Sequence, residues 1–310
     1  MNAKTLKQKK REQKYSSRPT GNFSVVAPFF FLLLSPATAK NAWGVIWIII
    51  KDFFFLQLNQ KFHFTKIPVI YVDTEIDDKI PFSPSHASDY MGFVEYFIRP
   101  FSMLKKRLGY KKAIPYINLY LKLIQKIYSN AALIYRFCMT TTRRPKYYKS
   151  KKFRAIHFFD PHLLCVPSIH VSIAAGLYAW FAQLYKTGIL PEDEAARRLK
   201  EAKDQAVRIV ESVLFVKQHS VNCVPLALYM MTSTMNKSFF TPKEACDFID
   251  SLFVETDEIS KEDKKLINEH FHYMYERALL ENCYSSNWQE CIRHWLVDYA
   301  RETNQNLPFI

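Results

Sequence analysis

Two short polar stretches of the sequence carry residue types that could act on a phosphate group. Residues 167–170 read PSIH and residues 217–219 read KQH, and each stretch adjoins an apolar segment. Phosphoryl transfer needs cations on the phosphate oxygens, a nucleophile in line, and an acid that protonates the leaving oxygen. Histidine can fill either of the last two roles because its pKa lies near neutrality. His170 and His219 are therefore the candidate catalytic pair.

A third polar stretch could supply the cations. Residues 140–154 read TTTRRPKYYKSKKFR, with Arg143 and Arg144 at its start. The planar guanidinium group matches two phosphate oxygens, and flanking lysines add a positive field. A basic loop can also serve only as a cytoplasmic anchor, and this second interpretation stays open.

The elements that must position these residues are predicted to be helices. The chain of 310 residues has 25 Phe and 18 Tyr but only 6 Gly, which favours helices over turn-rich β structure. Residues 23–58 hold two apolar runs that almost touch, and they predict either one membrane span or a broken hairpin. The later apolar segments are shorter and carry interspersed charges, so a soluble helical bundle is an alternative. These later segments are 89–104, 113–139, 163–186, 203–217 and 220–235.

The charge is unevenly distributed. The net charge is +14, but residues 237–310 hold 8 Lys and Arg against 14 Asp and Glu, about −6, so residues 1–236 carry about +20. Basic charge beside apolar runs favours a membrane surface over nucleic acid as partner. Residues 1–22 are basic and almost without apolar side chains, which predicts a disordered cytoplasmic tail. The six cysteines form no C-x-x-C pair, so they predict neither a metal site nor a disulfide framework.

Residues 237–310 are predicted to form a small, acidic, soluble helical appendage that could bind a protein partner. Thr241 and Glu244 form a capping box around Pro242, and Ser260 and Asn287 are expected to cap two further helices. His270 and His272 lie two residues apart, hence on different helix faces, which argues against a shared ligand role.

The order of these motifs resembles the type 2 phosphatidic acid phosphatase superfamily. An Arg-Pro pair, then Pro-Ser-x-His, then Lys-x-His is most similar to the branch that includes inositol-phosphorylceramide synthase-like proteins. The stretch IDDKIPF at 76–82 is similar to an element that follows the first span in that branch. The likeness covers roughly residues 40–235.

The resemblance implies an all-α, multi-pass membrane bundle of about six helices that works without a metal or cofactor. It implies that His219 is the nucleophile, which forms a phosphohistidine, and that His170 protonates the leaving group. Arg144 would hold the phosphate with a hydrogen bond from Ser168, and Arg143 or Lys217 would supply a further cation.

Two positions depart from the family pattern. Phe137 replaces the lysine of the first motif, and Cys223 replaces the aspartate that orients the nucleophilic histidine. Asp160 or Glu211 could provide that carboxylate instead.

These inferences give a domain plan: a tail (1–22), a membrane helical domain (23–236) and the appendage (237–310). If each apolar region crosses the cell membrane once, both termini are cytoplasmic and the three polar stretches meet on the opposite face. The predicted function is phosphatase or phosphotransferase activity on a lipid phosphate, such as phosphatidic acid. The alternatives are a catalytically inactive membrane scaffold and a soluble nucleic-acid binder.

Overall fold

The computed structural model describes residues 14–147, 149–151, 153–154 and 161–307, and it confirms the predicted all-α class. Its α-helices are α2 (Val26–Leu33), α3 (Pro36–Ile48), α4 (Leu56–Lys61), α5 (Ala87–Met91), α6 (Phe93–Leu108), α7 (Tyr110–Tyr135), α9 (Ile169–Lys186), α10 (Glu192–Phe215), α11 (Cys223–Thr234), α12 (Pro242–Ile249), α13 (Lys261–Asn282) and α14 (Trp288–Glu302). A π-helical segment joins α3 to α4, and short 3-10 helices and two strands complete the described elements: η2 (Ile49–Phe55), η1 (Thr20–Asn22), η3 (Glu75–Lys79), η4 (Pro84–His86), β1 (Val69–Tyr71) and β2 (Met139–Thr141).

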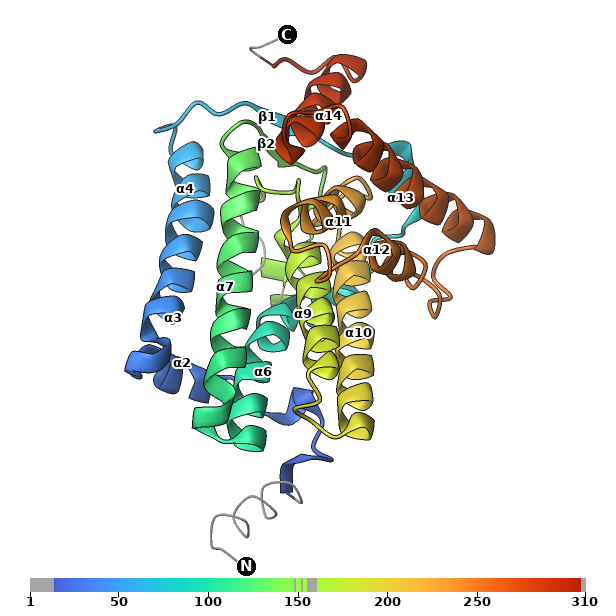
Figure 1. The fold of residues 1–310 in the computed structure, drawn as a ribbon. Helices are drawn as coiled ribbons and strands as arrows, with labels where there is room; N and C mark the ends of the chain where they lie inside the picture. The colour runs from blue at the N-terminus through green and yellow to red at the C-terminus, as the bar shows by residue number, and fades with distance from the viewer. Residues whose placement is uncertain (1–13, 148, 152, 155–160, 308–310) are drawn as a thin grey trace, which may run out of the picture.

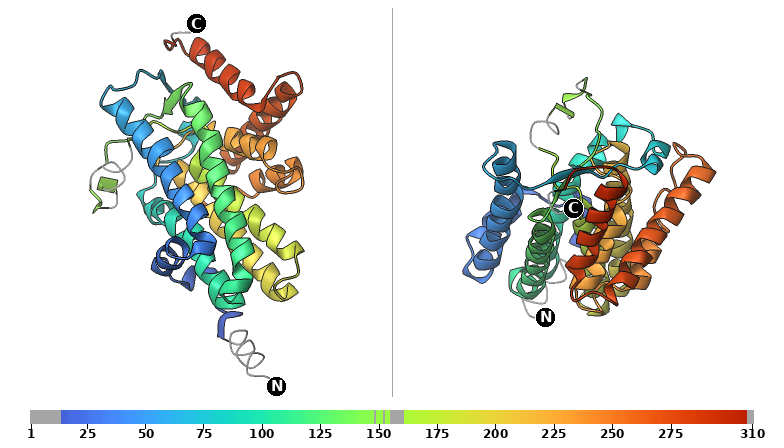
Figure 2. Two further views of the ribbon diagram at one scale, coloured as in Figure 1. Left: turned by 60° about the vertical axis from the view of Figure 1, so that its left-hand side comes forward. Right: turned by 90° about the horizontal axis from the view of Figure 1, so that it is seen from above.

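The long helices α3, α6, α7, α9 and α10 lie side by side in an elongated bundle (Figures 1 and 2). Helix α9 packs against α6, α7, α10 and α11, so it is the central helix. Gly176 permits this packing, because a Cβ there would lie 3.1 Å from Ile127 of α7 and 3.2 Å from Met231 of α11. The PSIH stretch contains the N-cap and the first two residues of this central helix, so the bundle holds that stretch in place.

A small parallel sheet lies at one end of the bundle. Strand β1 pairs with β2 in the register Ile70 to Thr140, and Thr140 also forms a bridge with Leu164. The segment before α9 therefore runs beside the strand that leads into Arg143 and Arg144.

One helical run, Pro36–Lys61, is long and apolar enough to cross a membrane; it is the one such run in the described part of the chain. Only 28% of its most apolar window is buried. Trp43 and Trp47 of this run expose 56% and 60% of their surface. This segment gives weak support to the predicted membrane association.

The N-terminal residues 14–22 pack against α10 instead of forming the predicted disordered tail. The fully buried Arg198 donates hydrogen bonds to the carbonyls of Tyr15 (3.0 Å) and Ser16 (3.3 Å). Thr20 donates to Glu201 through its amide at 3.0 Å. Residues 1–13 lie outside the described residues.

The three predicted helix caps in the acidic C-terminal segment are confirmed. The side chains of Thr241, Ser260 and Asn287 accept hydrogen bonds from the first turns of α12, α13 and α14. This segment is not a detached appendage, because Tyr275 of α13 donates to Thr232 of α11 at 3.2 Å and Tyr229 donates to the carbonyl of Trp288 at 3.1 Å. Its apolar side chains join the same core as the bundle.

Residues 14–22 and helix α14 lie at opposite ends of the bundle (Figure 1), and the prediction that both termini are cytoplasmic stays a prediction. Helix α11 is short compared with the long helices of the bundle. Its 12 residues extend about 18 Å, too short to run the length of the bundle, so the chain turns back. As a result α14 packs at the end that holds β1, where Gln305 exchanges hydrogen bonds of 2.7 and 2.8 Å with the backbone of Tyr71.

Candidate active site

The PSIH stretch forms the N-terminus of α9. Ser168 is the N-cap residue, and its hydroxyl accepts a hydrogen bond of 3.3 Å from the amide of Val171. Its carbonyl accepts a hydrogen bond of 3.0 Å from the amide of Ser172, and Tyr135 of α7 donates to the carbonyl of Pro167 at 2.5 Å. These contacts hold Ser168 and His170 at the start of the central helix.

His219 lies in the loop between α10 and α11. Lys217 adopts a positive φ of 56°, which lets the chain turn sharply after α10. The amides of Gln218 and His219 then donate to the carbonyl of Val213, at 2.9 and 3.2 Å. The turn directs the His219 ring back into the bundle, where the residue is only 6% exposed.

The structure brings His219, His170 and Ser168 together. The Nε2 atom of His219 lies 3.2 Å from Nδ1 of His170 and 3.3 Å from Oγ of Ser168. The Nδ1 atom of His219 lies 3.2 Å from the carbonyl oxygen of Cys165. Because a carbonyl only accepts, Nδ1 carries the proton and Nε2 keeps its lone pair. That lone pair faces the other two side chains, as a nucleophilic nitrogen would.

Burial keeps the His219 ring neutral. Its pKa lies well below the ordinary value because of desolvation first, and then because of the neighbouring His170 and His162 rings. A neutral imidazole is the form that can attack phosphorus.

The cavity beside these rings is small. It has a volume of about 20 Å³ and is lined by Phe53, His162, Leu164, Cys165, Ile169, His170, Gln218 and His219. A cavity needs roughly 10–15 Å³ for one water molecule, so this space holds about one water and no phosphate. The space beside the rings is therefore too small for a phosphate group, and the two imidazoles contact each other directly.

The predicted cations occupy different places. Arg144 donates from Nη1 to the side-chain oxygen of Gln218 at 3.0 Å, which brings it next to the residue that precedes His219. The Arg143 guanidinium lies over the ring of Tyr71 at 5.9 Å, and the Arg143 amide is bound by Asp73 at 2.9 Å.

Lys217 contacts backbone carbonyls, and its predicted role in holding phosphate stays a prediction. Its ammonium group donates to the backbone carbonyls of Asp77 and Ile80, both at 2.5 Å. All three cations border a groove of about 810 Å³ that also contains Asp73 and Asp77. This groove, and not the histidine cavity, is the larger space at this end of the bundle.

Among the described residues no carboxylate hydrogen-bonds to His219, and the Nδ1 atom of this residue bonds the backbone carbonyl of Cys165 instead. The carboxylate of Glu211 accepts a hydrogen bond from the amide of Phe253 and not from His219. Asp160 lies outside the described residues. The buried acid of the His219 loop is Asp77, which accepts from Ser220 Oγ (2.7 Å) and from the amide of Val221 (2.8 Å). Burial raises the pKa of Asp77 to about 6 against the effect of these bonds.

Sequence reasoning missed the roles of Asp77 and His162. Asp77 belongs to the IDDKIPF stretch, whose resemblance to the family was the available signal. His162 lines the histidine cavity, but its only sequence signal is its position eight residues before His170. His270, although not a ligand, donates toward the Oδ1 atom of Asn222 at 2.8 Å and so contacts the His219 loop.

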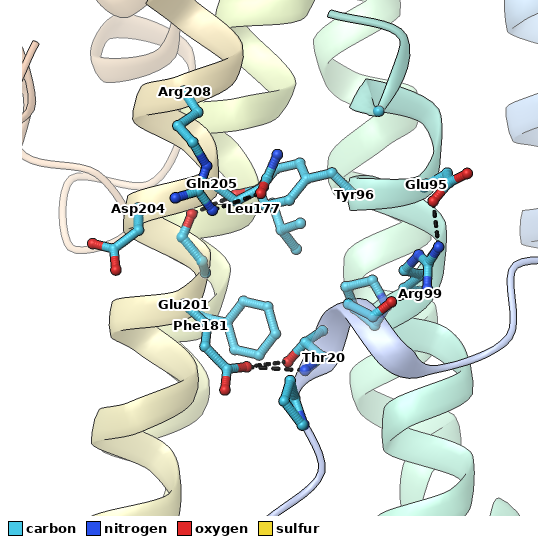
Figure 3. Close-up of a pocket in the computed structure, with 15 residues that line it drawn as sticks. Thr20, Glu95, Tyr96, Arg99, Leu177, Phe181, Glu201, Asp204, Gln205 and Arg208 are labelled. Atoms are coloured by element: carbon cyan, nitrogen blue, oxygen red, sulfur yellow. Dashed lines mark hydrogen bonds and ion pairs between the residues drawn. The ribbon is translucent and has the colours of Figure 1, made fainter. Parts of the chain in front are cut away.

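A separate cavity of about 380 Å³ lies between η1, α6, α9 and α10 (Figure 3). It contains Arg99, the arginine of the second Arg-Pro pair, which forms an ion pair with Glu95. Arg208 pairs with Gln205 at 2.8 Å, and Glu201 with Thr20 at 2.9 Å. Because several of these polar groups bond one another and none of the predicted catalytic or phosphate-binding residues lines the space, this cavity is not the candidate active site.

Among the described residues, no three His, Cys, Asp or Glu side chains are arranged to hold a metal ion. Comparisons with protein-family models, with curated proteins and with solved structures found no match.

Proposed function

We propose that this chain transfers the phosphoryl group of a lipid phosphate through a phosphohistidine intermediate on His219. The observation that carries the proposal is the contact between His219 and His170. Two imidazoles separated by 49 positions meet at 3.2 Å, with Ser168 at 3.3 Å from the same nitrogen. A structural helix start would need the serine but neither ring.

In the proposed reaction the Nε2 atom of His219 attacks phosphorus, and the bond from phosphorus to the leaving oxygen breaks. His170, protonated in the presence of the anionic phosphate, gives its proton to that oxygen. In hydrolysis a water molecule then attacks the phosphohistidine, returns a proton to His170 and releases phosphate. In transfer, the hydroxyl of an acceptor takes the place of this water. Arg144 and the Ser168 hydroxyl would stabilise the charge on the phosphate oxygens.

The lipid part of the proposal rests on Phe53. This side chain belongs to η2, inside the helical run Pro36–Lys61, and it forms one wall of the histidine cavity. The segment with the strongest membrane character thus borders the candidate site directly. We propose that the bundle is a multi-pass membrane domain and that the substrate enters from the lipid beside this helix.

The test is phosphate release by the purified protein in detergent micelles, with phosphatidate and an isoprenoid diphosphate as substrates. We expect His219→Ala and His170→Ala each to reduce kcat by about 10³-fold or more, because each removes a reacting group. His272→Ala is the matched control, since His272 bonds the exposed Asp250 at 2.7 Å and does not line the histidine cavity. Acid-labile phosphate on His219, detected by mass spectrometry after rapid quenching, would identify the intermediate. Equal turnover of wild type and both site variants would refute the proposal.

A catalytically inactive membrane scaffold is the second candidate, favoured by two observations. The cavity of about 20 Å³ is too small for phosphate, and Lys217 is bound to backbone carbonyls. The scaffold predicts that wild type releases no phosphate above background, and that orthovanadate leaves its melting temperature unchanged.

A further inference from the structure

His162 is a third histidine at the same cavity, and the proposed reaction does not use it. Its side chain is buried, with only 5% of the residue exposed, and it lines the cavity together with His170 and His219. Its Nε2 atom lies 2.6 Å from the hydroxyl of Thr142. Its backbone has φ of 63°, in the left-handed region that residues other than glycine rarely adopt. This backbone turn is what directs the ring toward Thr142.

The hydroxyl of Thr142 connects two parts of the candidate site. It lies 3.3 Å from the backbone carbonyl of Lys217, which can only accept. The hydroxyl therefore donates to Lys217 and accepts from the Nε2–H group of His162. Thr142 directly precedes the Arg143-Arg144 pair, and Lys217 lies two residues before His219. The hydrogen bonds thus join the segment that carries Arg144 to the loop that carries His219.

Backbone hydrogen bonds between the segment after His162 and strand β2 hold His162 beside Thr142. The amide of Thr140 donates to the carbonyl of Leu163 at 3.0 Å, and the amide of Cys165 donates to the carbonyl of Thr140 at 3.2 Å. The amide of Val166 donates to the Thr140 hydroxyl at 2.7 Å. Residues 162–166 therefore run alongside β2, and His162 meets Thr142 as part of this pairing.

We propose that His162 is a positioning residue for phosphoryl transfer. Through Thr142 it holds Arg144 and His219 at a fixed separation, so that the guanidinium group and the nucleophile act on one phosphate. The inference rests on the proposed function for its catalytic consequence, whereas the hydrogen-bonded connection itself can be measured without any substrate.

The perturbation is His162→Asn, with His63→Asn as the matched control. Asparagine tolerates a left-handed backbone but is too short to reach Thr142, so the change removes the connection without imposing a new backbone. His63 has nearly the same φ, 61°, and is exposed just after α4. We expect His162→Asn to lower kcat/KM about 10-fold, the effect of one lost hydrogen bond, and His63→Asn to leave it unchanged. Thr142→Val should lower it equally, the double variant no further, and Thr142→Ser should retain wild-type activity.

Hydrogen–deuterium exchange supplies the readout that needs no substrate. We expect faster amide exchange at residues 216–221 in His162→Asn and Thr142→Val, and no change in His63→Asn. If wild type proves inactive on every lipid phosphate, the proposed function fails while the exchange data still decide whether His162 holds this loop. Unchanged exchange at 216–221 would overturn the inference, and so would additive losses in the double variant of an active enzyme.

Discussion

Replacing Cys223 with aspartate separates what the family resemblance implies from what the geometry shows. The resemblance places an aspartate at this position to orient the nucleophilic histidine. In the structure the Nδ1 atom of His219 is already bound by the Cys165 carbonyl at 3.2 Å. We therefore expect Cys223→Asp to bring no gain in activity and to destabilise the protein.

The magnitude follows from the surroundings of Cys223. The residue has no exposed surface. The pKa of its thiol is raised well above the ordinary value, by burial first and then by the charges of Asp77 and Asp73. A new carboxylate would meet the same burial and the same two like charges. A buried charge without a partner costs about 3–5 kcal/mol, which for a chain of this length lowers the melting temperature by roughly 5–10 °C.

Thermal unfolding in detergent at pH 5 and pH 8, combined with phosphate release, tests this expectation. Burial raises the folded-state pKa of the introduced carboxyl above its unfolded value. The protonated form is therefore tolerated at low pH, and stability is lost as the pH rises through the raised pKa. The difference from wild type should be larger at pH 8 than at pH 5. Cys223→Ser, which adds no charge, should cost about 1 kcal/mol at both pH values. A Cys223→Asp protein with a raised kcat, or with an unchanged melting temperature at pH 8, would refute the reasoning.

Three further predictions concern buried polar groups. Asp77 has a folded-state pKa of about 6 against 3.8 for the free side chain, so its protonated form contributes stability below about pH 4 that is lost as the pH rises through 6. Asp77→Asn should therefore flatten the pH dependence of the melting temperature between pH 4 and 7, and an unchanged slope would contradict this. Ser168→Ala removes the cap of α9 and a hydroxyl beside His219. We expect it to lower the unfolding free energy by about 1 kcal/mol and kcat by about 10²-fold. Activity within twofold of wild type would argue against the proposed role of Ser168 at the phosphate oxygens. Glu194 is 4% exposed and binds Arg107 and Arg198, each at 2.8 Å. Glu194→Ala leaves two buried guanidinium groups without their carboxylate and should cost about 3–5 kcal/mol by chemical denaturation, whereas exposed Glu269→Ala should cost less than 1 kcal/mol.

Local signals in the sequence predicted the helices well, because each depends on a few neighbouring residues. The caps at Thr241, Ser260 and Asn287 were read from hydroxyl or amide side chains before a helical pattern, and the structure has all three. The path of the chain between helices was harder to predict. The stretch 220–235 is as apolar as a crossing segment, yet its helix has only 12 residues before the chain turns back. Hydropathy measures how apolar a segment is, and it carries no information about where the next helix packs.

At the candidate site, too, local sequence signals predicted the positions of residues, whereas contacts between distant parts of the chain could not be predicted. Ser168, His170 and His219 were predicted together and lie together, because short motifs at helix ends fix them on the backbone. The position of Lys217 could not be read from its sequence neighbours. Its long flexible side chain turns to backbone carbonyls of the η3 segment, a contact across 137 positions or more. Long side chains choose their partners only after the distant parts of the chain have come together.

The His170 and His219 rings contact each other directly at 3.2 Å. A neutral pair is stable at 3.2 Å because one nitrogen donates while the other accepts. If both rings carried protons on the facing nitrogens, the contact would become repulsive. A phosphate anion between the rings would remove this repulsion. It would stabilise the protonated form of His170, and it would replace the hydrogen bond that His219 Nε2 accepts. If the chain binds phosphate as proposed, binding must open this contact, and the apparent dissociation constant is the intrinsic one divided by the fraction of molecules in which the contact is already open. The proposed function therefore predicts a separation of His170 and His219 larger than 3.2 Å when phosphate is bound.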